Sequence, residues 1–381
     1  MHTRGNSAVR KAKKGVTVGF FSPLPPAHTG VADYAAALLG ELRRHGTTEI
    51  APRRCDIALY HLGNNALHAA IYRRALDAPG VVTLHDAVLH HFLLGQLDEP
   101  TYIQEFVYNY GEWTRGLARD LWRGRAGSGA DSRYFDYPML KRAAERARAV
   151  VVHNPAAARA VARHASGARV VEIPHLFQMP ELPAEAEALR YRQRLGVEPG
   201  ALLFGVFGFL RESKRLVTVL EAFAELRQEF PRIALLVAGE FVSTGLERAV
   251  KPLMRVAGVV RRPYLAPREF WLAARAVDAC INLRDPAAGE TSGIAIRLMG
   301  LGKPTLISDT PEASPFPEDA CLRIATGVAE RESLLRHMVL LTSMSGVAGA
   351  IGRRGAGHIQ ACHRVEQAGN RYWQLLCEFC T

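Results

Sequence analysis

Residues 202–240 read LLFGVFGFLRESKRLVTVLEAFAELRQEFPRIALLVAGE, and this stretch decides the fold. Its apolar runs at 202–210 and 233–240 have the length of strands, and the segment between them carries apolar side chains at helical spacing. Because both runs are apolar almost to their ends, each strand is expected to be buried on both faces, as in a parallel sheet covered by helices. The stretch therefore predicts a strand, a helix and a second, parallel strand.

The same alternation extends from this unit toward both ends of the chain. Each strand-like run is separated from the next by a helical segment long enough for the right-handed crossover that parallel strands require. The further runs are 258–264, 278–283 and 304–309 on one side, and 15–22, 56–62, 80–86, 148–154 and 169–175 on the other. The chain is therefore predicted to form two doubly wound α/β domains that face a common cleft.

The length of the chain agrees with two domains, because 381 residues exceed the roughly 250 to 300 at which one hydrophobic core stops growing. The boundary is placed in a proline-rich stretch at 177–200, and extra helices are expected at 98–140. The predicted parts are a basic, disordered tail at 1–15, an N-terminal domain at 16–188, a C-terminal domain at 189–360, and a last helix at 361–381 that packs back across the domains.

Nearly half of the net charge of +11 lies in the N-terminal tail, where residues 4–14 carry five cations and no acid. Such a block is usually a solvated arm, and it also attracts an anionic membrane at about 1 kcal/mol per basic residue. The six scattered cysteines are typical of reduced thiols, and no apolar run reaches the roughly 18 residues of a membrane span. We expect a cytoplasmic protein whose tail can contact the inner face of the membrane, and no specific nucleic-acid partner.

The loop after the strand at 202–207 has the residues of an anion site. Gly208 opens it, and Arg211, Lys214 and Arg215 follow just before a helix begins. Cationic side chains and the backbone amides at a helix N-terminus both favour a phosphate group. A solvated turn is the alternative, and neither a P-loop nor a dinucleotide fingerprint is present.

A second polar loop, at 284–293, lies at the corresponding end of a later strand. Thr291 or Ser292 can cap the next helix, Gly293 lets a ligand approach the backbone, and Glu290 can accept hydrogen bonds from sugar or ribose hydroxyls. The alternative is that Glu290 only stabilises the helix dipole.

Polar residues also end the strands of the first half. His85 and Asp86 follow one strand and His153 follows another, and Asp86 and His153 are expected on the acceptor side of the cleft. Asp33 lies in the first turn of a helix, where it is either an acceptor-side residue or a helix-stabilising carboxylate. Together with His90 and His91, the first two residues suggest a metal hydrolase as an alternative. We expect no metal site, because adjacent helical residues point in different directions.

These segments, taken in order, resemble the large retaining glycosyltransferase family 4, which has the GT-B fold. The segments LVAGE and GETSGIAIRLMGLGKPTLISD are similar to its donor half, and FFSPLPPAHTGVADYAAALL, LHDAVLHH and VVVHNP to its acceptor half. The resemblance implies a hexosyltransferase that moves a sugar from a nucleotide-diphosphate sugar to a glycan or lipid-linked acceptor with retention of configuration. The nucleotide sugar is a substrate, and no further cofactor is expected.

The resemblance also implies roles for individual residues. Lys214 would contact the diphosphate, Glu290 and the amides after it would hold sugar and ribose hydroxyls, His85 would face the transferred sugar, and Gly30 would lie close under the phosphates. Two positions depart from the family: Phe209 occupies a usual arginine position, so that Arg211 or Arg215 must supply the charge, and Arg297 occupies the position of a second glutamate. These departures leave a non-catalytic protein of the same fold as an alternative.

Overall fold

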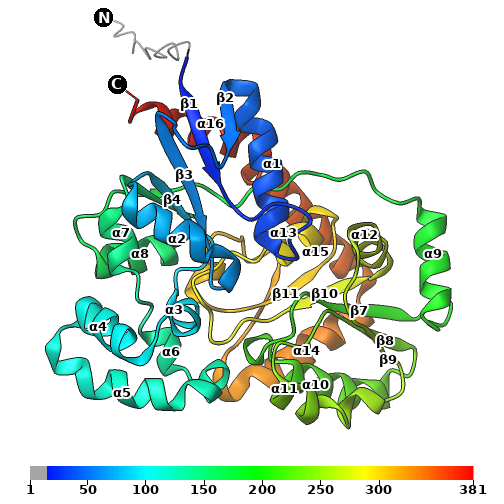
Figure 1. Cartoon of the computed structure of the whole chain (residues 1–381). Coiled ribbons are helices and arrows are strands. Elements are labelled where there is room, and N and C mark those ends of the chain that lie inside the picture. The colour runs from blue at the N-terminus through cyan, green and yellow to red at the C-terminus, as the bar shows by residue number, and fades with distance from the viewer. Residues whose placement is uncertain (1–14, 381) are drawn as a thin grey trace, which may run out of the picture.

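The computed structural model describes residues 15–380 and contains two six-stranded parallel sheets (Figure 1). The first sheet has the strand order β2-β1-β3-β4-β5-β6, and every strand pairs in parallel with its neighbours. Its strands are β1 (Thr17–Phe21), β2 (Thr47–Ile50), β3 (Ile57–Leu62), β4 (Val81–Leu84), β5 (Ala149–Val152) and β6 (Val170–Glu172). This half contains the N-terminal alternation that the sequence predicts.

The second sheet has the order β12-β11-β10-β7-β8-β9 and is also parallel throughout. Its strands are β7 (Leu202–Phe207), β8 (Ile233–Ala238), β9 (Val259–Arg262), β10 (Ala279–Asn282), β11 (Thr305–Ser308) and β12 (Leu322–Ile324). The unit at 202–240 therefore lies at the centre of this sheet, with α10 between its two paired strands. Both sheets are the doubly wound type that the sequence predicts.

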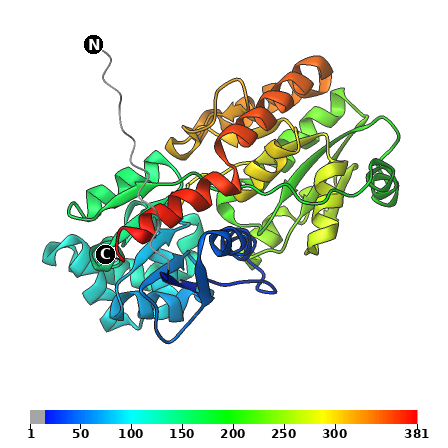
Figure 2. The same ribbon diagram turned by 90° about the horizontal axis from the view of Figure 1, so that it is seen from above.

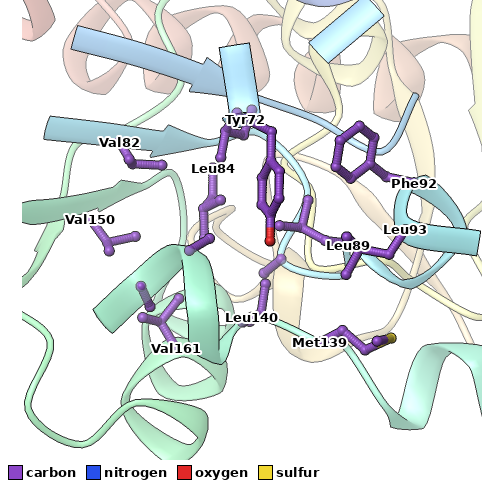
Figure 3. Packing of buried hydrophobic residues seen from close by; sticks show 14 of the residues in the cluster. Tyr72, Val82, Leu84, Leu89, Phe92, Leu93, Met139, Leu140, Val150 and Val161 are labelled. Carbon is purple, nitrogen blue, oxygen red and sulfur yellow. The ribbon is translucent and has the colours of Figure 1, made fainter. Parts of the chain in front are cut away.

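Helices cover both faces of the first sheet because its strands alternate apolar side chains between the faces. Ile57 and Leu59 of β3 belong to the core cluster with α1 (Gly30–His45), whereas Tyr60 and Leu62 belong to the cluster on the other face. Figure 3 shows part of that second cluster, in which Tyr72 lies beside residues of three other segments. The other helices of this half are α2 (Ala69–Asp77), α3 (His90–Gln96), α4 (Glu99–Tyr110), α5 (Arg115–Gly124), α6 (Arg133–Asp136), α7 (Lys141–Arg146) and α8 (Pro155–His164).

The second sheet is covered in the same way. Phe204 and Val206 of β7 pack with α10 and α14, and Leu203 and Phe207 pack on the opposite face with α9 and α12. The helices here are α9 (Glu185–Arg194), α10 (Leu216–Glu229), α11 (Thr244–Val250), α12 (Pro267–Ala276), α13 (Gly293–Gly300), α14 (Glu330–Ser343) and α15 (Ser345–Cys362).

The last helix, α16 (Val365–Cys377), packs against α1 of the first half, and Figure 2 shows this helix (red) running from the second half across the first. Tyr372, Trp373 and Leu376 of this helix are buried in the same cluster as α1 and the first sheet. The Tyr372 hydroxyl lies 3.0 Å from that of Tyr34 and 3.1 Å from that of Thr83. One helix from the C-terminal end therefore completes the core of the N-terminal half.

The structure differs from the predicted elements at both sheet edges. The strands β2 and β12 were not predicted, because TTEI contains only one buried residue and LRI is only three residues long. The predicted basic tail and its membrane contact through 4–14 lie outside the described residues. Among residues 15–380, no single helix is long and apolar enough to cross a membrane, although the bent pair Gly327–Ser343 and Ser345–Cys362 meets the length and composition of a span.

Candidate active site

The two polar loops that the sequence identified lie side by side at the carboxyl edge of the second sheet. The loop after β7 meets the loop after β10 through a hydrogen bond from the Asp285 amide to the Ser213 carbonyl, 2.8 Å long. Since the strands β7 and β10 are direct neighbours, their C-terminal loops share one edge of the sheet. The fold therefore brings the segments around Lys214 and Glu290 together.

Lys214 is almost fully buried, with 5% of its surface exposed. Its Nζ donates a 2.6 Å hydrogen bond to the Phe207 carbonyl at the end of β7, and no carboxylate within the described residues forms an ion pair with it. Burial, with the nearby cations Arg284 and Arg211, lowers the pKa of the amine well below its ordinary value. A polyanion bound beside it would reverse this effect by stabilising the charged amine.

Glu290 forms an ion pair with one of these cations, Arg284. Its Oε1 lies 2.9 Å from Nε of Arg284, and its Oε2 accepts a 2.7 Å hydrogen bond from the Ala288 amide. Both side chains of this ion pair are about one-fifth exposed. Arg284 is the first residue of this loop but was not predicted as a site residue, because a lone arginine at the end of a strand carries no distinguishing spacing.

Asp86, at the end of β4, brings a second carboxylate to this cluster from the other half of the molecule. Its Oδ2 accepts a 2.8 Å hydrogen bond from the Asn64 amide. Burial and the neighbouring charge of Glu290 raise the pKa of Asp86, whereas Arg211 and Arg284 act in the opposite direction. The cluster therefore combines three basic and two acidic side chains between the two sheets.

The halves are in direct contact around this cluster. A β-carbon on Gly289, whose φ is +73°, would lie 2.5 Å from the β-carbon of Ala87, so the loop approaches as closely as glycine allows. The Asn154 amide donates 3.0 Å hydrogen bonds to the Gly289 carbonyl and to the Thr291 hydroxyl. The Oδ1 atom of Asn154 also accepts a hydrogen bond from the Ala157 amide and thereby caps α8.

Two arginines in the predicted anion site lie in different environments. Arg211 is exposed and influences the pKa of both Lys214 and Asp86. Arg215 instead turns away, because its backbone has a left-handed φ of 56° and its guanidinium pairs with the buried Glu330 at 2.8 Å. Of the two arginines, Arg211 lies with the cluster and Arg215 pairs with Glu330, and a contact of either one with a diphosphate stays a prediction.

His85 and His153 lie in the interior rather than on the surface of the cleft. His153 Nδ1 donates to the Ile173 carbonyl, so its Nε2 must accept from Nδ1 of His85, and Nε2 of His85 must accept from Nδ1 of His61. Burial lowers the pKa of all three rings, to about 4 for His153. A contact between His85 and a transferred sugar, or between His153 and an acceptor, stays a prediction and requires one of these hydrogen bonds to break.

The remaining predicted residues lie near the starts of two helices. Ser292 caps α13 by accepting from the Ala295 amide, and Gly293 is the first residue of that helix, as predicted. Gly30 is the exposed first residue of α1, and a β-carbon there would meet nothing within 4 Å. Gly208 has a φ of +86°, and a β-carbon there would lie 3.7 Å from Nζ of Lys214. These glycines leave backbone accessible, in keeping with the expected close approach of a ligand.

The histidines of the metal-site alternative are already engaged. His90 bonds the Tyr137 carbonyl and the Tyr102 hydroxyl, and His91 bonds the Ser128 carbonyl. In the part of the chain that the structure describes, no three histidine, cysteine, aspartate or glutamate side chains are arranged to hold a metal ion.

No protein-family model and no curated protein sequence matches this chain. Its structure is similar to sucrose-phosphate synthase from Thermosynechococcus elongatus, with a TM-score of 0.68, 14% identity, and coverage of 94% of this chain and 98% of that one. It is also similar to HepE from Anabaena in complex with UDP and glucose (0.66, 14%, 95% and 100%) and to WaaG, a glycosyltransferase involved in lipopolysaccharide biosynthesis (0.62, 12%, 95% and 99%). The chain therefore has the GT-B fold, with two Rossmann-like halves, as the resemblance implies.

Proposed function

We propose that this protein is a glycosyltransferase that uses a nucleotide-diphosphate sugar as donor. The observation that carries the proposal is the cluster of Lys214, Arg211, Arg284, Glu290 and Asp86 between the facing sheets of a GT-B fold. The cationic side chains suit a diphosphate, and the two carboxylates suit sugar hydroxyls. In HepE, the structural neighbour, UDP and glucose are bound together.

In this proposal the cations act on the leaving group. Negative charge develops on the diphosphate as its bond to the sugar breaks, and preformed donors in a partly buried site stabilise that charge. Lys214 is held by the Phe207 carbonyl in the ligand-free protein, and it turns its charge toward the diphosphate when a donor binds. Gly30, Gly208, Thr291, Ser292 and Gly293 complete the donor site as backbone or hydroxyl contacts.

The reaction we propose proceeds with retention onto a glycan or lipid-linked acceptor. The departing diphosphate stays on the reacting face and takes the proton of the acceptor hydroxyl, while Asp33 lies on the acceptor side. A cytoplasmic enzyme with its basic tail against an anionic membrane fits a lipid-linked acceptor. The configuration of the product, read by NMR, tests retention directly.

The decisive experiment has two stages. A thermal-unfolding screen of nucleoside diphosphates and their sugars identifies the donor, because a ligand at 100 times its Kd stabilises the native state by about 2.7 kcal/mol. Release of nucleoside diphosphate in the presence of candidate acceptors then measures turnover. Lys214→Ala is expected to lower turnover by roughly 10² or more, because a single electrostatic donor is worth about that factor.

Lys251→Ala is the matched control, because Lys251 is an exposed lysine at the end of α11 and is expected to leave turnover unchanged. If no nucleotide or nucleotide sugar stabilises the chain, the proposal is wrong. Binding without diphosphate release for any acceptor favours the non-catalytic alternative, for which the departures at Phe209 and Arg297 are the evidence.

A further inference from the structure

A histidine in the same region, His68, has a ring nitrogen with no partner. His68 ends a short 3-10 helix (Ala66–His68) and is fully buried. Its Nδ1 lies 2.8 Å from the His61 carbonyl, which can only accept, so Nδ1 carries the proton and Nε2 carries a lone pair. Among residues 15–380, no donor forms a hydrogen bond with that Nε2.

An unsatisfied buried acceptor costs stability, so native proteins retain one mainly where a ligand or ordered water completes it. Burial also lowers the pKa of His68 to about 4, which keeps the ring neutral and the lone pair available at neutral pH. The Nε2 atom of His68 is therefore a preformed acceptor that lacks a donor.

The position of Gly63 indicates where this acceptor is directed. A β-carbon built on Gly63 would lie 2.9 Å from Nε2 of His68 and 3.2 Å from Oδ2 of Asp86. The two acceptor atoms thus lie on the same side of Gly63, which directly follows β3 and packs so closely against them that a side chain there would clash. The Asn64 amide holds Asp86 in this position.

The chemistry of this place selects its ligand. Nε2 of His68 and Oδ2 of Asp86 are both acceptors, so the ligand must supply hydrogen-bond donors. The cations Arg211 and Arg284 lie close enough to affect the pKa of Asp86, and they disfavour a positively charged ligand. Neutral hydroxyl groups satisfy both conditions. Asp86 is also a neighbour of Glu290, at the point where the proposed donor carries its sugar.

We propose that Nε2 of His68 and the carboxylate of Asp86 accept hydrogen bonds from hydroxyl groups of the sugar on the nucleotide donor. His68 is then a specificity-determining residue, because a site built around hydroxyl groups rejects sugars that lack them. This inference rests on the proposed function and adds to it which residues recognise the transferred sugar.

The test uses two substitutions that separate the two ring nitrogens. In His68→Asn, the side-chain amide can still donate to the His61 carbonyl as Nδ1 does, but no acceptor remains at the position of Nε2. In His68→Gln, the amide oxygen restores an acceptor at that position. Titration calorimetry with the full chain measures Kd for the best-stabilising nucleotide sugar and for its bare nucleoside diphosphate. We expect His68→Asn to raise the Kd for the nucleotide sugar roughly 3- to 10-fold, the value of one hydrogen bond, and to leave the Kd for the nucleoside diphosphate unchanged. His68→Gln is expected to recover part of the loss.

His337→Asn is the matched control, because Nδ1 of His337 also contacts a backbone carbonyl, that of Ser333, and the residue lies on α14. Gly63→Ala gives a second test should His68→Asn not fold, because its methyl group would crowd both acceptor atoms and should likewise weaken binding of the nucleotide sugar alone. If His68→Asn changes the Kd values for the nucleotide sugar and for the nucleoside diphosphate equally, or changes neither, the inference is wrong and the proposed function still stands. Failure of wild-type protein to bind any nucleotide sugar overturns both.

Discussion

Arg297 Nη2 lies 2.9 Å from Asp33 Oδ2, so that an ion pair joins α13 of the second half to the first turn of α1 in the first. The family resemblance implies a glutamate where Arg297 stands, and the arginine instead faces a carboxylate from the opposite domain. Asp33 is about half exposed, so the pair contributes little to stability and acts mainly on how the halves meet.

This pairing gives a prediction for Asp33→Asn. If Asp33 only orients Arg297, the substitution should lower kcat/KM by less than about 10-fold, because an exposed ion pair is worth at most about 1 kcal/mol. A general base would instead contribute about 10² to 10⁴. Initial rates of diphosphate release distinguish the two ranges, and Asp77→Asn, an exposed aspartate at the end of α2, serves as the control.

Arg211 and Arg215 should behave differently although they are four residues apart. Arg211→Ala is expected to weaken nucleoside diphosphate binding with little change in melting temperature. Arg215→Ala should lower the melting temperature, because the buried Glu330 loses its charged partner at a cost of about 1 to 3 kcal/mol. Calorimetric Kd and melting temperature for both variants check the assignment, and the reverse pattern would contradict it.

Nucleotide binding should take up protons through Lys214. Burial and the neighbouring Arg284 lower the pKa of this amine, and a diphosphate bound beside it would raise that pKa again. The apparent affinity should therefore increase as the pH falls toward neutrality. Calorimetry in buffers of different ionisation enthalpy measures the proton count. Lys214→Ala should abolish the proton uptake. If this variant takes up as many protons as the wild-type protein on nucleotide binding, another group is responsible for the uptake.

The buried imidazoles predict a loss of stability in acid. His68 and His153 have folded-state pKa values of about 4, below the ordinary 6.5, so the unfolded chain binds more protons between these values. The stability from each ring is present above pH 6.5 and is lost as the pH falls toward 4, about 3 kcal/mol per ring. Melting temperatures from pH 8 to 4.5 should fall steeply below 6.5, and His153→Asn should make the slope shallower. A flat profile would contradict the neutral network.

Most of the fold could be predicted from local sequence patterns, but the edge strands of the two sheets could not. Central strands such as 202–207 are buried on both faces and therefore read as continuous apolar runs, whereas β2 and β12 are short edge strands that give no such signal. Parallel topology also places strand C-termini together, which is why Lys214, Glu290 and Asp86 were predicted to share a cleft.

The rest of the site depends on geometry that sequence spacing does not encode. The direction of Arg215 is set by one left-handed backbone angle and by a glutamate 115 residues away. His85 was expected at the cleft because it ends a strand, but its ring joins an interior hydrogen-bond chain whose members come from three different strand ends. Arg284 and His68 stand out only once their neighbours are known.

The return of α16 to the first half also bears on how the protein is synthesised. While the ribosome adds residues in order, the first sheet has an uncovered apolar surface until Tyr372, Trp373 and Leu376 emerge. Nascent chains that contain only the N-terminal half therefore expose an apolar surface that chaperones can bind and that favours aggregation. The first half can bury this surface only after the whole second half and α16 have been synthesised, so the N-terminal half cannot complete its core ahead of the C-terminal one.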